Sequence, residues 1–191
     1  MGNETKRPAT YEDLLALPEH VVGQIIDGEL IVMPRPANLH AVIYSRLLAD
    51  LNGTFEHERG RLGGWWIVGE PELHLGRDVL VPDIAGWRIE RMPDVPVAPY
   101  FTLAPDWVCE VLSPSTRALD RKRKPEVHAR EGVGHMWLVD PESRTLEVLQ
   151  QQDGQWAPRG TWSGDACVRA APFEELELNL GTLWLRKPQA P

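Results

Sequence analysis

The sequence predicts a mixed α/β fold, and three features carry the prediction. Apolar residues recur at helical spacing over about 38–58, which indicates a long amphipathic helix. Short apolar runs follow over 65–87, separated by Gly, Pro or polar residues, as is typical of a strand meander. Two continuous apolar segments, 107–113 and 135–140, then flank a segment of helical composition. This strand–helix–strand order predicts two parallel strands joined by a right-handed crossover.

Shorter signals complete the expected element order. Thr10 precedes Asp13 by three residues, which resembles a capping box and predicts a short helix. Asp27 and Gly28 lie between two apolar runs. This pair predicts a two-residue β-hairpin, because both turn positions need positive φ. The helix before the last buried strand is expected to end at Gly132, and antiparallel strands are expected after it.

The length of 191 residues fits one domain, so we expect a single domain over residues 1–191. Its ends, about 1–9 and 186–191, are expected to be mobile. Two cysteines without a C-x-x-C pair favour a reduced, cytoplasmic protein over a disulfide framework. No segment approaches the ~18 apolar residues of a membrane span, so no membrane association is expected.

The charge and the missing motifs narrow the classes of function. A formal net charge of −8 argues against a protein that coats nucleic acid passively, because such proteins carry a basic surplus. The same charge is compatible with a site where metal ions offset acidic side chains. The sequence has no H-x-x-x-H metal spacing, no G-x-S-x-G nucleophile motif and no phosphate-binding P-loop.

Two acidic residues interrupt apolar strands. Asp83 follows Pro82, and a proline there indicates an edge, a bulge or a bend that redirects side chains; the alternative is an Asp that caps a turn. Glu110 lies inside the apolar segment 107–113, where an ionised carboxylate must coordinate a metal or pair with a cation such as Arg. At the ends of adjacent strands, the two acids can share a hard divalent cation.

A basic run follows the second acid. It consists of Arg117, Arg121, Lys122, Arg123 and Lys124. These residues would bring positive charge next to the cation and help to hold a phosphodiester; the alternative is an ordinary solvated helix face. His40, at the start of the long helix, could contact a phosphate or cap the helix.

The order Pro-Asp, Glu and a downstream Lys resembles that of the PD-(D/E)-x-K nucleases. More closely, the segments VPDIAGW, APDWVCEVLSPSTRALDRKRK and EGVGHMWLVDPE are similar to the Uma-two family of restriction-endonuclease-like proteins within that superfamily. The segment IIDGELIVMPRPANLHAVIYSRL resembles the family's N-terminal hairpin and helix. The likeness covers about residues 10–150.

The resemblance implies a restriction-endonuclease-like core, which is a mixed sheet flanked by helices with a metal site at one end. Asp83 and Glu110 match the family's metal-binding acids, and the backbone carbonyl of Val111 would be a further ligand. Glu29 matches an N-terminal acid that faces the site. Lys124 matches a catalytic lysine moved onto the following helix.

Two positions depart from the family's pattern. Gln24, which is neutral, stands where the family often has an acid before the hairpin turn. Pro125 directly follows Lys124, and a residue before proline is pushed out of the α region. Lys122 or Arg123 could therefore serve in place of Lys124.

The function that this resemblance implies is a Mg²⁺- or Mn²⁺-dependent endonuclease that hydrolyses phosphodiester bonds of DNA. Because no separate DNA-recognition domain is evident, we expect a homodimer. The alternative is a nuclease-fold module with weak or no catalysis that acts by binding nucleic acid or protein. A structural homo-oligomer whose acids form ion pairs is a third interpretation.

Overall fold

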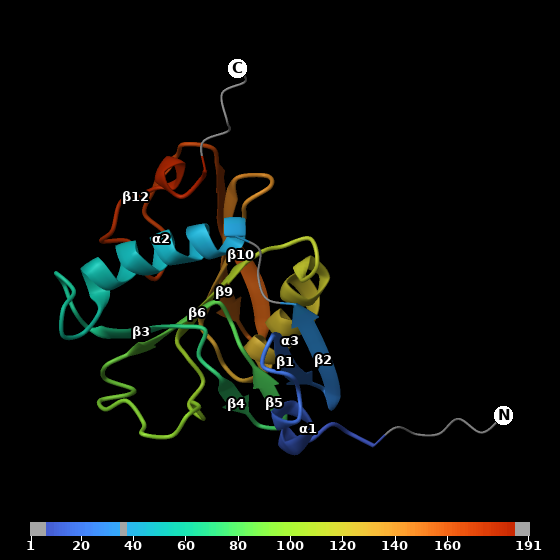
Figure 1. Cartoon of the computed structure of the whole chain (residues 1–191). Helices are drawn as coiled ribbons and strands as arrows, with labels where there is room; N and C mark the ends of the chain where they lie inside the picture. The colour runs from blue at the N-terminus through green and yellow to red at the C-terminus, as the bar shows by residue number, and fades with distance from the viewer. Residues whose placement is uncertain (1–6, 35–37, 186–191) are drawn as a thin grey trace.

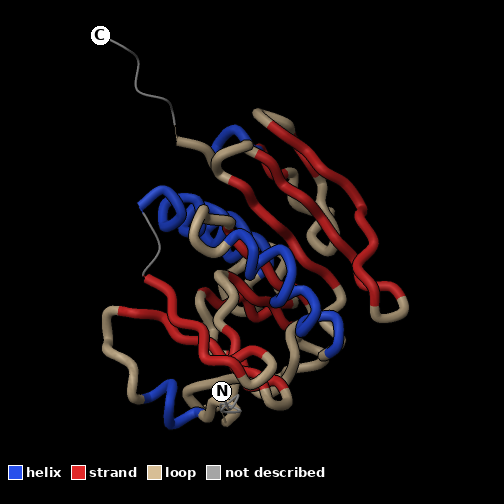
Figure 2. Tube along the Cα trace, turned by 90° about the vertical axis from the view of Figure 1, so that its right-hand side faces the viewer, coloured by secondary structure: helices blue, strands red, loops and turns tan. Residues whose placement is uncertain are grey.

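The structure is a computed structural model that describes residues 7–34 and 38–185. Its described strands form a six-stranded sheet of order β10-β9-β8-β7-β6-β3, a four-stranded sheet of order β2-β1-β5-β4 and the pair β11-β12 (Figure 1). Figure 2 shows the strands gathered in separate groups with helical segments between them. The mixed α/β fold predicted from the sequence is confirmed.

The elements have the following bounds. The larger sheet consists of β3 (Trp65–Gly69), β6 (Ile84–Arg88), β7 (Trp107–Val111), β8 (His135–Asp140), β9 (Thr145–Gln152) and β10 (Gln155–Ser163). The other strands are β1 (Val21–Ile26), β2 (Glu29–Pro34), β4 (Leu73–Leu75), β5 (Asp78–Leu80), β11 (Cys167–Val168) and β12 (Leu178–Asn179). The helices are α1 (Tyr11–Leu15), α2 (Asn38–Phe55), the π-helical turn η1 (Leu119–Arg123), α3 (Lys124–Arg130) and the 3₁₀ turn η2 (Leu180–Thr182).

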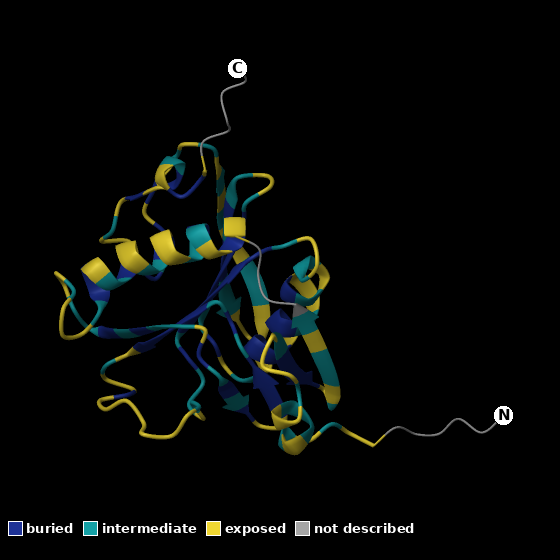
Figure 3. Ribbon diagram, in the orientation of Figure 1, coloured by how far each residue is buried: buried dark blue, intermediate teal, exposed yellow. Residues whose placement is uncertain are grey.

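Strand β7 is the centre of the larger sheet, and its side chains alternate between two apolar cores. Trp107, Cys109 and Val111 pack on the side of α2, whereas Val108 packs on the side of α3. Strand β8 runs parallel to β7, as the strand–helix–strand pattern predicts. Figure 3 shows the outer surface of α2 exposed above buried strands. Glu110 therefore projects from a strand that is covered on both faces, into the layer beneath α3.

The hairpin of β1 and β2 forms as predicted. Asp27 and Gly28 have φ values of 53° and 78°, which the two-residue turn requires. The hairpin is tied to the η1–α3 segment, because Arg123 donates to the carbonyl of Ile26 at 2.9 Å and Arg130 pairs with Asp27 at 3.3 Å. The smaller sheet is thereby held beside the helix that follows β7.

The helix predictions are confirmed in position and corrected in detail. The long helix ends at Phe55 rather than near residue 58, and Gly132, with a φ of 81°, follows the end of α3 as predicted. The π-helical turn was not predicted.

The predicted mobile ends at 1–6 and 186–191 lie outside the described residues. Residues 7–9 were also expected to belong to the mobile N-terminal end. The structure describes them, and Arg7 pairs with Asp13 at 2.6 Å. Within the described ranges, no helix is long and apolar enough to cross a membrane.

Candidate active site

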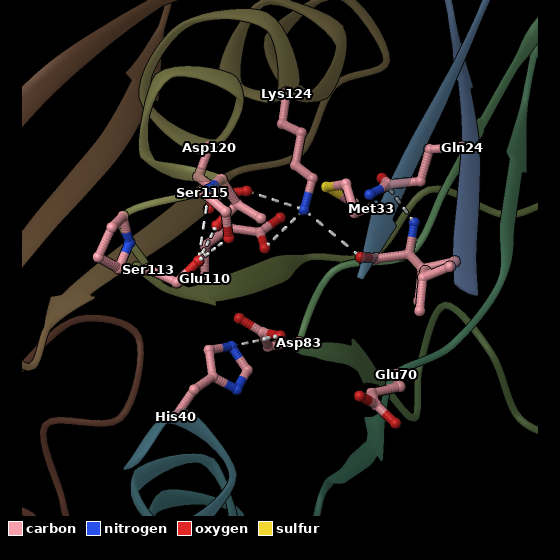
Figure 4. Close-up of a pocket in the computed structure, with 14 residues that line it drawn as sticks. Gln24, Met33, His40, Glu70, Asp83, Glu110, Ser113, Ser115, Asp120 and Lys124 are labelled. Carbon is pink, nitrogen blue, oxygen red and sulfur yellow. Dashed lines mark hydrogen bonds and ion pairs between the residues drawn. The ribbon is translucent and has the colours of Figure 1, made fainter. Parts of the chain in front are cut away.

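A pocket of about 500 Å³ lies where the end of β7 meets the smaller sheet, η1 and the first turn of α2. Its lining includes Asp83, Glu110 and Lys124, together with Gln24 and His40. Figure 4 shows these side chains arranged around one space. All five residues were singled out in the sequence, and the fold brings them together from segments far apart in the chain.

Asp83 and Glu110 end the ladder between β6 and β7. Ile84 pairs with Cys109 in this antiparallel ladder, so the next residues outward, Asp83 and Glu110, lie opposite each other. Asp83 is fixed from two sides, because its Oδ2 accepts from the Val111 N–H at 2.6 Å and its Oδ1 lies 3.0 Å from Nε2 of His40. The Asp83 carboxylate thus rests against the Val111 backbone.

Glu110 is buried, with 1% of its surface exposed. Its Oε2 accepts a hydrogen bond from the Lys124 amine at 2.9 Å. Its Oε1 has no hydrogen-bond partner in the described part of the chain, and the nearest imidazole nitrogen, Nε2 of His128, is 3.9 Å away. One carboxylate oxygen is therefore paired, and the other is buried without a hydrogen-bond partner among the described residues.

Lys124 is the cation at the centre of the site. Its amine also lies 3.0 Å from Oδ1 of Asp120 and 3.5 Å from the carbonyl of Val81. Burial lowers the pKa of Lys124, but the carboxylates of Glu110 and Asp120 outweigh burial and raise that pKa above its usual value. The amine is therefore a protonated hydrogen-bond donor in a buried pocket.

The π-helical turn explains how Lys124 reaches the site despite the proline after it. Lys124 keeps helical dihedrals, φ −60° and ψ −45°, and its N–H donates to the carbonyl of Leu119. This bond spans five residues, one more than in an α-helix, so the turn contains an extra residue. An extra residue rotates the following side chains by roughly 100° about the helix axis. Lys122 lies on the exposed side of the same turn.

His40 and Asp120 also take part in the site. His40 is 7% exposed and pairs with Asp83. Burial lowers the pKa of His40, but the bond to Asp83 and the nearby carboxylate charges together outweigh burial, and the pKa is raised. Asp120 is 2% exposed, and its place in the site was not predicted, although it stands four residues before Lys124, a spacing that pairs side chains on a helix.

The remaining basic residues do not line the pocket, which corrects the expectation that the whole run lies next to the site. Arg117 pairs with Asp140 at 2.7 Å and Arg121 pairs with Glu147 at 2.9 Å. Arg123 pairs with Glu29 at 2.6 Å. The Glu29 side chain is 65% exposed and does not line the pocket. The sequence could not reveal these partners, because each lies far from the run.

The donor set fits a hard divalent cation, which restriction-endonuclease-like families generally use. Among the described residues, no group of three or more His, Cys, Asp and Glu side chains is placed to hold a metal ion. Mg²⁺ is commonly bound by only one or two carboxylates, with water and substrate phosphate completing its shell. Asp83 and Glu110 match that smaller requirement, and Oε1 of Glu110 has no hydrogen-bond partner among the described residues.

Comparisons with known proteins agree with this geometry. The model of the Uma2 family, described as "putative restriction endonuclease", matches residues 9–181. The chain belongs to the Uma2 family. This Uma2 chain is also similar to a solved structure from Anabaena variabilis ATCC 29413, described as a "putative nuclease belonging to DUF820". The TM-score is 0.75 and the identity 27%, over 93% of this chain and 98% of that chain. No curated protein matches the chain.

The family resemblance inferred from the sequence is thus confirmed. Family and fold together support a nuclease, and they extend the likeness from about residues 10–150 to residues 9–181.

Proposed function

We propose that this Uma2 protein is a metal-dependent endonuclease that hydrolyses phosphodiester bonds of DNA. The observation that carries the proposal is the position of Asp83 and Glu110 opposite each other at the end of one ladder, with the Lys124 ammonium on Glu110. Two facing carboxylates and a buried lysine in one pocket suit phosphodiester hydrolysis, which needs a cation site and a fixed donor for a charged substrate.

In this proposal Asp83, Glu110 and the Val111 carbonyl would hold Mg²⁺ or Mn²⁺. The bound cation supplies an activated water and offsets the charge of the phosphate. His40 fixes the Asp83 carboxylate, because its ring lies 3.0 Å from Oδ1. Lys124, anchored by Asp120, offers its remaining hydrogen-bonding capacity to a phosphate oxygen or to the attacking water.

Glu29 enters the mechanism only if substrate draws it away from Arg123. Its carboxylate lies 2.6 Å from that guanidinium, on the exposed side of the hairpin. A role in orienting water would therefore require the ion pair to open. If Glu29 acts in this way, Glu29→Gln lowers turnover while leaving the metal affinity of the pocket unchanged.

One observation favours the alternative of a nuclease-fold module without turnover. Glu110 is already neutralised by Lys124, and three arginines of the basic run already form ion pairs within the chain. They are Arg117, Arg121 and Arg123. A module of this kind would bind a nucleic acid or a protein without cleaving it. A cleavage experiment distinguishes the two functions, because only the nuclease produces cut DNA.

Supercoiled plasmid with Mg²⁺ or Mn²⁺ tests the proposal directly. Nicked and linear products are expected from the wild type and not from Asp83→Ala or Glu110→Ala. If the wild-type and Asp83→Ala preparations give the same products, the proposed nuclease is ruled out and the binding module is favoured. Chelation of the metal provides a second control on the same sample.

We also propose a homodimer as the active form in the cytoplasm. Cleavage of both DNA strands needs two sites, and this chain presents one such pocket among its described residues. Light scattering after size exclusion measures the mass in solution. A mass of one chain, retained in the presence of DNA and metal, would contradict the dimer.

A further inference from the structure

Gln24 sits in the middle of β1, is fully buried and lines the pocket. Its Oε1 accepts a hydrogen bond from the Val81 N–H at 3.0 Å. Because a backbone N–H can only donate, this contact fixes the orientation of the side-chain amide. The amide oxygen faces Val81, and the NH₂ group is directed away from it.

The NH₂ group of Gln24 has no hydrogen-bond partner among the residues that the structure describes. A buried donor without a partner costs roughly 1–3 kcal/mol, so such groups are expected to meet a ligand or an ordered water. The Lys124 amine contacts the carbonyl of the same residue, Val81, at 3.5 Å. Figure 4 shows the ends of the Gln24 and Lys124 side chains on the same side of the pocket. Gln24 and Lys124 therefore bracket Val81: the Gln24 oxygen accepts from its N–H, and the Lys124 amine donates to its carbonyl.

The charge of the site decides what the free NH₂ group can bind. It cannot ligate a cation, and the oxygen that could do so is committed to Val81. The pocket is already lined by four carboxylates, against the single charge of Lys124. A further acid would therefore add to the repulsion of an anionic substrate. The four are Glu70, Asp83, Glu110 and Asp120. A neutral donor adds no such repulsion.

We propose that Gln24 is a substrate-binding residue whose NH₂ group donates to a non-bridging oxygen of the substrate phosphate beside Lys124. The inference rests on the proposed phosphodiesterase function. It assigns a role to Gln24 at a position where the family often has an acid. Compared with an acid at this position, Gln24 lowers the affinity of the site for the cation and raises its affinity for the anionic substrate. The Gln24 oxygen also holds the Val81 segment that leads to Asp83.

Gln24→Glu is the decisive substitution, because a carboxylate keeps the acceptor for the Val81 N–H and replaces only the donor. Mg²⁺ affinity and the affinity of the Mg²⁺-loaded protein for inorganic phosphate are measured by calorimetry at mildly alkaline pH. The variant should bind Mg²⁺ more tightly and phosphate at least about tenfold more weakly than the wild type. These opposite changes cannot arise from partial unfolding, which weakens both.

Gln24→Met is the neutral control, since it removes the donor, together with the acceptor for the Val81 N–H, without adding charge. It should weaken phosphate binding without the gain in Mg²⁺ affinity that is expected of Gln24→Glu. The inference is overturned if the wild type does not bind phosphate, if both variants bind phosphate like the wild type, or if Gln24→Glu weakens both ligands. Plasmid cleavage by the wild type distinguishes failure of the Gln24 role from failure of the nuclease proposal. If the wild type cleaves DNA and both variants bind phosphate like the wild type, only the role of Gln24 is contradicted. If the wild type does not cleave DNA, but Gln24→Glu binds Mg²⁺ more tightly and phosphate more weakly, only the nuclease function is contradicted.

Discussion

The amine of Lys124 lies 2.9 Å from Oε2 of Glu110, and neither side chain is more than 4% exposed. A buried charge that loses its partner is strongly destabilising, because the remaining charge is neither solvated nor neutralised. Lys124→Met leaves Glu110 and Asp120 without their cation. We expect a loss of about 3–5 kcal/mol in the free energy of unfolding, measured by urea titration without metal.

The exposed neighbour provides the control for this loss. Lys122→Met changes the same residue type two positions away and should shift the free energy of unfolding by no more than about 0.5 kcal/mol. Adding Glu110→Gln to Lys124→Met should recover part of the loss, because one unpaired carboxylate is removed. Equal stabilities of the wild type and Lys124→Met would contradict the buried pair.

Metal binding should compete with Lys124 for Glu110, and this competition is visible in melting temperature. Mg²⁺ or Mn²⁺ at a hundred times Kd stabilises the folded state by about 2.7 kcal/mol, so the wild type should melt at a higher temperature. Glu110→Gln should abolish the rise. Lys124→Met should show a larger rise than the wild type, since the cation then neutralises carboxylates that lack another partner. A rise that persists unchanged in Glu110→Gln would remove this residue from the metal site.

The Arg117–Asp140 pair makes stability depend on pH. Burial raises the pKa of Asp140, but the Arg117 guanidinium and the N–H groups of Glu142 and Ser143 outweigh it and lower the pKa to about 2. An unfolded Asp has a pKa of about 3.9, so the contribution to stability is complete above that value. It is lost as the pH falls through the folded pKa, when the carboxylate takes up a proton.

Asp140→Asn removes this contribution at every pH. The variant should unfold about 2 kcal/mol more easily than the wild type at neutral pH. The difference should shrink as the pH is lowered toward the folded pKa, and urea titrations at a series of pH values measure it. A difference that stays constant over that range would show that ionisation of Asp140 does not contribute.

The fold and the two central acids were predictable because their signals are local. Asp27-Gly28 defines its hairpin from two adjacent residues, and Glu110 is conspicuous because its neighbours in β7 are apolar. That Glu110 and Asp83 would meet followed from strand order and family likeness together. Their pairing through adjacent ladder positions is a consequence of the antiparallel register of β6 and β7.

The environment of the basic run was not predictable, because its partners are distant in sequence. Arg123 meets Glu29 across 94 positions and Arg121 meets Glu147 across 26. The direction of the Lys124 side chain depends on the π-helical turn, and no residue pattern in the sequence distinguished that turn from an α-helix. Helical periodicity therefore located the helix but not the directions of its side chains at the turn where the site lies.

The last prediction concerns this turn. If the protein is a nuclease, Lys124→Ala should lower kcat far more than it weakens DNA binding, because a lysine beside the reacting groups acts mainly in the transition state. Its amine lies within the pocket, 2.9 Å from Glu110. Lys122 is exposed and is expected to act only as a distant phosphate contact. Lys122→Ala should therefore reduce affinity, cut the salt dependence of binding by about one unit and leave kcat unchanged.

Both variants are compared in single-turnover cleavage at saturating DNA, with the folded fraction of each checked by circular dichroism. Metal is kept in excess so that Glu110 and Asp120 are not left without a cation in Lys124→Ala. Loss of cleavage in Lys122→Ala with retention in Lys124→Ala would place the catalytic lysine on the exposed side of the turn. Unchanged cleavage in both would require a donor from elsewhere, and Gln24 and His40 are the polar residues that face the same pocket.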